Sequence, residues 1–218
     1  MQKKNFVMLA AFAAGTVVTW AQADTLTGQY TGLYQRNVDV TLDSIHSGNI
    51  ATVTFQWTRT DAPGPGIDST ISSPFRGYCI EINQNVSANT NYTYDVVSAA
   101  TYGFTALQET LLGRLWASFQ PSVVSQDTSA AFQMAVWELA FDADADLSNG
   151  DFFATSPSGV KALAQSWLNT VSSSGYSGGQ DPIKVLQHPT VQDQLVPAPG
   201  ALALLGVGSV MATRRKRA

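Results

Sequence analysis

The sequence predicts an α+β protein, with an antiparallel β-sheet, small barrel or sandwich and a packed helical subdomain of about three helices. In the first half of the chain, apolar and polar residues alternate through segments rich in Thr, Val and Tyr, as is typical of strands. From Phe104 onward, apolar residues recur three and four positions apart, as is typical of helices. The change of period predicts a β unit followed by helices packed on it.

The strand segments follow one another in the first hundred residues. Residues 25–60 contain the alternating runs VDVTL and ATVTFQW, which predict two or three antiparallel strands joined at a turn over 47–49. The Gly- and Pro-rich segment 61–74 predicts a surface loop. The runs FRGYCIEI (75–82) and YTYDVVSA (92–99) predict two further strands.

Three helices are expected in the second half. The first spans 105–119, and five of its side chains form a buried stripe: Leu107, Leu111, Leu112, Leu115 and Trp116. The second is an amphipathic helix over 128–141, capped by Asp127 or Thr128 and ended at Asp142. One stripe of that helix is formed by Gln133, Val136, Trp137 and Ala140.

After the acidic loop DADADLSNGDFF, the third helix spans 156–173, with Ser156 or Ser158 as its cap. A linker over 172–180 leads to the segment 182–196, which predicts one or two final strands.

Composition excludes several classes of function. Of the 218 residues only 13% are charged, and the formal net charge is −4 although basic residues gather at both ends. The chain therefore offers no basic face for nucleic acid. It has two histidines far apart, His46 and His188, and lacks both a Gly-rich phosphate loop and a G-x-S-x-G elbow. A hydrolase built on Glu138 and Asp142 has only helical spacing in its favour, so we do not expect an enzyme.

The N-terminal segment predicts export. Lys3 and Lys4 precede an apolar run that ends near Trp20, and the small-x-small sequence Ala-Gln-Ala comes before Asp24. This order is typical of a secretory signal peptide over 1–23. One mature domain is expected over 24–192, and its single cysteine, Cys79, excludes an internal disulfide.

A tail is expected over 193–218. Its apolar part is short for a bilayer of about 30 Å, and the basic cluster that follows would stop translocation. The Pro-rich motif, the short apolar segment and the basic cluster together resemble a PEP-CTERM sorting signal, with Ala where that family commonly has Glu. The residues of this candidate sorting signal are Val196, Pro197, Ala198, Pro199, Gly200, Arg214, Arg215, Lys216 and Arg217, and Ala198 is the one that departs from the family. The resemblance implies an exosortase-type processing enzyme as a partner, transient membrane association through the tail, and a place at the cell surface or in an extracellular polysaccharide matrix.

Two motifs inside the mature domain resemble the thioester domain of bacterial surface adhesins, the TQXA family. The first is Tyr78-Cys79, and the second is the run FQMAVW, in which Gln133 and Trp137 keep the family's register and Phe132 replaces a usual Thr. The resemblance covers about residues 75–170.

It implies a Cys79–Gln133 thioester that couples to amines or hydroxyls of a surface, polysaccharide or protein matrix target, in a pocket walled by Tyr78, Phe132 and Trp137. The alternative is a non-reactive structural protein of the envelope or matrix with the same fold.

The acidic loop supports a separate expectation. Asp142, Asp144 and Asp146 alternate along the chain and could offer hard oxygen ligands to a calcium ion. The segment departs from the EF-hand pattern, because Gly is missing at the sixth position and Phe153 replaces the bidentate Glu. The other reading is a solvated turn, and no further cofactor is expected.

Overall fold

A computed structural model describes residues 24–64, 66–142 and 144–198. The predicted signal peptide over 1–23 lies outside the described residues. The same is true of the tail from Pro199 to Ala218, which includes Gly200 and the basic cluster.

The sheet is built around a long hairpin. Strands β1 (Thr25–Leu42) and β2 (His46–Arg59) pair antiparallel from Gly28↔Arg59 to Leu42↔His46. The turn therefore lies at residues 43–45, and the predicted turn at 47–49 is wrong: Gly48 sits inside β2, with a φ of 119°. The hairpin is longer than a usual strand pair, which lets its two ends contact different partners.

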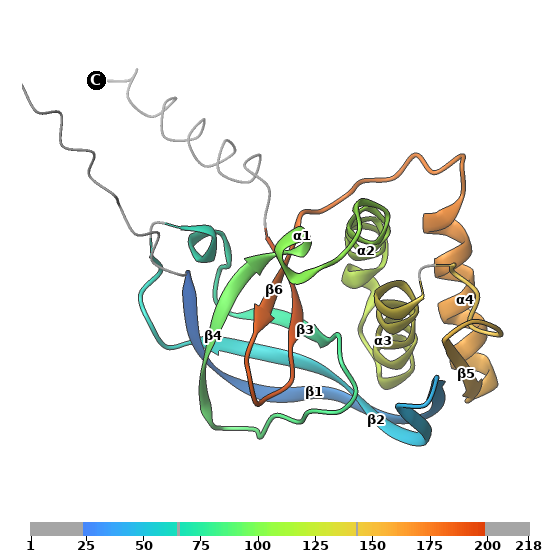
Figure 1. Ribbon diagram of the computed structural model, residues 1–218, viewed down its shortest axis with the longest axis horizontal. Coiled ribbons are helices and arrows are strands. Elements are labelled where there is room, and N and C mark those ends of the chain that lie inside the picture. The colour runs from blue at the N-terminus through green and yellow to red at the C-terminus, as the bar shows by residue number, and fades with distance from the viewer. Residues whose placement is uncertain (1–23, 65, 143, 199–218) are drawn as a thin grey trace, which may run out of the picture.

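All described pairings are antiparallel, and the strand order is β2-β3-β7-β6-β4-β1-β5. Because β2 also pairs with β1, the strands β1, β2, β3, β7, β6 and β4 close into a ring. Strand β5 lies outside this ring and pairs with the C-terminal end of β1 (Figure 1). The remaining strands are β3 (Phe75–Cys79), β4 (Asn91–Ser98), β5 (Phe152–Ser156), β6 (Ile183–Gln187) and β7 (Gln194–Pro197). The α+β class is confirmed.

The helices are α1 (Ala99–Tyr102), α2 (Ala106–Phe119), α3 (Gln126–Phe141) and α4 (Ser158–Ser172), with short 3-10 turns at Ile67–Thr70 and Gln120–Ser122. Of these, α2, α3 and α4 gather on one side of the sheet (Figure 1). Helix α3 packs against β1, β2 and β3, and α2 and α4 flank it. It is thus the helix through which the sheet and the other helices meet.

Several predicted details of the second half are wrong. Helix α3 is not amphipathic, because every residue of 129–139 is buried, as expected for a helix packed on all sides. Leu107 is 59% exposed and does not belong to the buried stripe of α2. Strand β5 was not predicted, and α4 begins after Pro157 with no side-chain cap.

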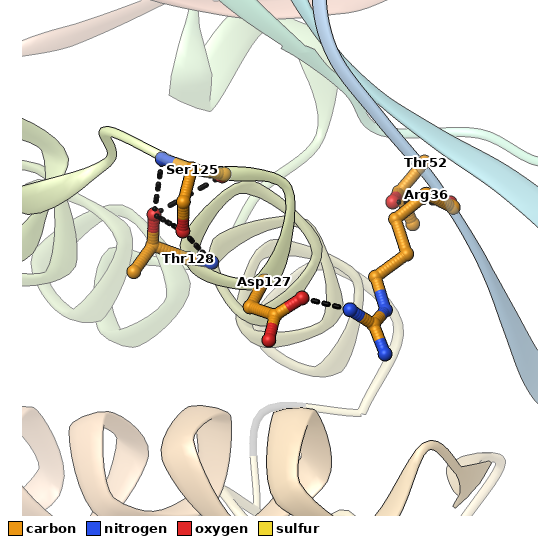
Figure 2. A network of polar contacts seen from close by, with 5 residues as sticks. All are labelled: Arg36, Thr52, Ser125, Asp127 and Thr128. Atoms are coloured by element: carbon orange, nitrogen blue, oxygen red, sulfur yellow. Dashed lines mark hydrogen bonds and ion pairs between the residues drawn. The ribbon is translucent and has the colours of Figure 1, made fainter.

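The start of α3 is fixed by a capping box, two residues earlier than predicted. The Ser125 hydroxyl accepts the N–H of Thr128, and the Thr128 hydroxyl accepts the N–H of Ser125 (Figure 2). Asp127, one of the two predicted caps, instead pairs with Arg36 of β1 across the helix end (Figure 2). The cap and the ion pair are separate interactions at one helix end.

We expect Ser125→Ala to lower the free energy of unfolding by about 1 kcal/mol, because an N-terminal donor of α3 loses its acceptor. Urea denaturation measures this change. Asp127→Asn removes only a pair whose side chains are 33% and 60% exposed, so we expect it to cost at most about 0.5 kcal/mol. Equal losses in the two variants would contradict the assigned cap.

The chain stays in the fold to Ala198. Strand β7 lies between β3 and β6, and the Ala198 N–H donates to the Pro182 carbonyl at 2.8 Å. Val196, Pro197 and Ala198, which sequence analysis assigned to the tail, are therefore part of the folded unit. One apolar core runs through residues 24–198. Within the described ranges, no helix has the length and apolarity to cross a bilayer.

Candidate functional site

Cys79 and Gln133 lie in direct contact at the centre of the molecule. The Cys79 N–H donates to Gln133 Oε1 at 3.1 Å, and Gln133 Nε2 donates to the Cys79 carbonyl at 2.7 Å. The glutamine is fully buried and the cysteine is 4% exposed. Two residues 54 positions apart are thus held together by a pair of buried hydrogen bonds.

The geometry of β3 explains why this contact exists. Along a strand, consecutive residues direct their backbone polar groups to opposite edges. Ile80 bonds to Asp193 on the β7 side, so Cys79 faces the β2 side. There the pairing with β2 ends at Phe55↔Gly77. The Gln133 amide takes the place of the missing strand and satisfies both backbone groups of Cys79.

Aromatic residues adjacent to the pair in sequence, and Trp137 one helical turn after Gln133, are buried in the same core. Tyr78, Phe132 and Trp137, the three predicted wall residues, are each fully buried. The Phe132 ring centroid lies 4.4 Å from that of Tyr78 and 5.8 Å from that of Trp116. The sequence did not single out Trp116 as a wall residue, although its place on the α2 stripe was recognised. The surroundings of the pair are therefore apolar.

Burial determines the protonation of the cysteine. It raises the pKa of the Cys79 thiol well above its usual range, and the Glu81 carboxylate adds to the rise. The Trp137 indole N–H makes no hydrogen bond to any described residue, yet it is near enough to the thiol to oppose this rise in pKa. The unreacted cysteine is a neutral thiol beside an otherwise unused N–H donor.

A cavity reaches Cys79 from one side. Its volume is about 150 Å³, and it lies between the β1–β2 hairpin and the segment after β3. Its walls combine apolar side chains with polar groups, and the lining residues are Tyr30, Ile50, Ala51, Val53, Phe55, Cys79, Ile82, Asn85, Val86 and Gln192. At about 30 Å³ per water molecule, the volume is enough for a small amine.

The acidic residues meet in a different set from the predicted one. Carboxylate oxygens of Glu138, Asp142 and Asp144 all lie within 4.8 Å of one another. Asp146 is not in this group, and its Oδ1 accepts the Ser148 N–H at 3.0 Å. Glu138 is not among the predicted ligands. The signal that indicates it is an acidic residue inside an apolar helix, four positions before Asp142 and therefore on the same face.

No family model matches this chain, and no curated protein matches it. A function is therefore inferred from the residues of the site and their geometry.

Proposed function

We propose that this protein is an exported surface or matrix protein whose Cys79 and Gln133 condense to a thioester that attaches it covalently to amines or hydroxyls of a target. The observation that supports this best is the pair of hydrogen bonds between the Gln133 amide and the Cys79 backbone. They hold the Gln133 side chain of α3 against the backbone of Cys79 on β3, in a buried place. The resemblance to thioester-domain adhesins points the same way.

The condensation balances without a further reagent. Cys79 Sγ bonds to Gln133 Cδ, the Cδ–Nε2 bond breaks, and the thiol proton leaves with the nitrogen as ammonia. A target amine then attacks Cδ, an amide forms, and the sulfur takes up a proton to regenerate the thiol. Neither step changes an oxidation state.

Three features of the site favour this chemistry. The Cys79 N–H donates to Gln133 Oε1, so it polarises the carbonyl that is attacked. The aromatic walls exclude water, which slows hydrolysis of a thioester. The cavity that Cys79 helps to line offers a small nucleophile an approach to this region.

Export and sorting belong to the same proposal. A signal peptide and an exosortase-type sorting tail would bring the domain to the cell surface, where a reactive bond can meet a target. The bond would also close a loop of 54 residues, which is worth about 4 kcal/mol of stability by restricting the unfolded chain.

The second candidate function is a non-reactive structural protein of the envelope or polysaccharide matrix. The specific observation in its favour is that the unreacted Gln133 amide already satisfies both backbone groups of Cys79. In that case the glutamine completes the sheet edge and no bond forms. The two candidates differ in one covalent bond, so mass distinguishes them.

We expect residues 24–198, purified without added amine, to have an intact mass lower than the sequence mass by one ammonia. Methylamine at mildly alkaline pH should then add its own mass to the protein and release one titratable thiol, because it opens the thioester at Cδ. Intact mass spectrometry and thiol titration measure both changes.

Cys79→Ala is the matched control, because it removes the single cysteine of the chain. It should show neither the mass deficit nor the methylamine adduct. A wild-type mass equal to the sequence mass, with the thiol titratable from the start in unfolded protein, would refute the thioester. The non-reactive structural function would then be the remaining candidate.

A further inference from the structure

The last turn of α3 and the loop after it bring three carboxylates together. Glu138 lies on α3, Asp142 ends the helix, and Asp144 follows in the loop. Their burial is graded from the fully buried Glu138 through the half-buried Asp142 to the exposed Asp144. The cluster therefore runs from the protein interior out to solvent.

Glu138 gives an independent sign that something is bound there. Its side chain is fully buried, and its Oε2 has no hydrogen-bond partner among the described residues. The other oxygen, Oε1, accepts the Asp146 N–H at 3.0 Å. A buried carboxylate oxygen without a partner is strongly unfavourable, and this oxygen belongs to a side chain whose carboxylate faces two others.

No basic side chain neutralises these groups within the part of the chain that the structure describes. Ion pairs in that part of the chain involve other carboxylates, such as Asp127 with Arg36 and Asp61 with Arg59. Backbone donors only position the loop: Asp142 Oδ2 accepts the Asp151 N–H at 2.6 Å, and Asp144 Oδ1 accepts the Asp146 N–H at 2.9 Å. Each carboxylate keeps lone pairs that these bonds do not use.

We propose that Glu138, Asp142 and Asp144 bind a calcium ion. Three carboxylates and no nitrogen or sulfur ligand favour a hard cation over zinc or copper. The set is irregular and open to water at Asp144, which suits the variable coordination of calcium better than the strict octahedron of magnesium. The ion would join the end of α3 to the loop that leads into β5.

Calcium binding is tested on residues 24–198 freed of metal with a chelator. With a Kd of about 0.1 mM, typical of weak extracellular sites, calcium at about 5 mM should raise the Tm by about 5 °C. Calorimetric titration should show one ion per chain. Magnesium at the same concentration should give less than about half the shift.

Burial and the nearby Asp144 and Asp142 raise the pKa of Glu138 to about 9, so the side chain is protonated without a cation at neutral pH. Glu138→Gln keeps this neutral shape and removes the ability to ionise, so we expect it to fold and to lose the calcium-dependent shift. Asp144→Asn, at an exposed position, should weaken binding at least about tenfold without any effect on the core. The matched control is Asp146→Asn, which changes an acidic residue of the same loop outside the cluster and should keep the wild-type response.

The proposal is overturned if the wild type shows no saturable calcium binding up to about 5 mM. It is equally overturned if Glu138→Gln responds as the wild type does, or if magnesium gives the same shift as calcium. None of these outcomes depends on the thioester, because the test can be repeated in Cys79→Ala.

Discussion

Replacement of Gln133 by alanine is expected to lower the free energy of unfolding by about 4 kcal/mol. The variant loses two buried hydrogen bonds and leaves the N–H and carbonyl of Cys79 without partners at a strand edge that β2 does not reach. Each unsatisfied buried group costs about 1–3 kcal/mol, and the truncated side chain leaves a cavity. Urea denaturation followed by far-UV circular dichroism measures the loss.

Gln126→Ala is the matched control, because Gln126 is exposed on the same helix. We expect it to change stability by less than about 0.5 kcal/mol. A loss below about 1 kcal/mol in Gln133→Ala would show that the contact does not hold β3 and α3 together.

Stability also separates the two candidate functions when Cys79 is changed. Cys79→Ala keeps both backbone hydrogen bonds to Gln133, so a chain without the thioester should lose only about 1 kcal/mol of small apolar burial. A chain that forms the bond should lose about 5 kcal/mol, because opening the closed loop costs about 4 kcal/mol in addition. A large loss of stability should therefore accompany a mass deficit in the wild type, and a small loss should accompany a full sequence mass.

The contact between Cys79 and Gln133 is a feature that periodicity alone did not predict. Residue types give a cysteine on an apolar strand and a glutamine on an Ala-rich helix, and both usually serve packing. Only the paired motifs suggested that the two side chains meet. They meet because the pairing of β2 with β3 ends at Phe55↔Gly77 and leaves the backbone of Cys79 open to Gln133. The point at which two strands separate depends on the whole sheet and not on the local sequence.

The wrong predictions have local physical causes. At the start of α3, Ser125, Asp127 and Thr128 are all good capping residues, and the pairing of Asp127 with Arg36, distant in sequence, helps to decide among them. Strand β5 has five residues and gains its partner from the far end of β1. A segment that short has little periodicity of its own, so its pairing cannot be predicted from the sequence.

The acidic cluster could have been predicted more fully. Residues 138 and 142 are four positions apart on a helix and share a face. Alternation within the loop drew attention to Asp146 instead, but Ala145 has a φ of 65° and the Asp146 carboxylate turns to the Ser148 N–H. Backbone conformation at one residue thus changed the ligand set.

The second large effect is expected at Phe132, where the thioester-domain family usually has Thr. Phe132→Ala should lower the free energy of unfolding by about 4 kcal/mol. The ring is fully buried, and it lies against Tyr78 of β3, Trp116 of α2 and Trp167 of α4. One side chain therefore joins three elements around α3, and urea denaturation measures what its removal costs.

Phe132→Thr tests whether this chain has room for the family's residue. We expect a loss at least as large as that of Phe132→Ala, because the threonine hydroxyl would enter an aromatic cluster. Phe132→Leu, which fills most of the space, should lose only about 1–2 kcal/mol. If Phe132→Thr were as stable as the wild type, the aromatic cluster would not be what requires Phe here. If it is unstable as expected, Phe132 is explained by the three aromatic neighbours that this chain places around it.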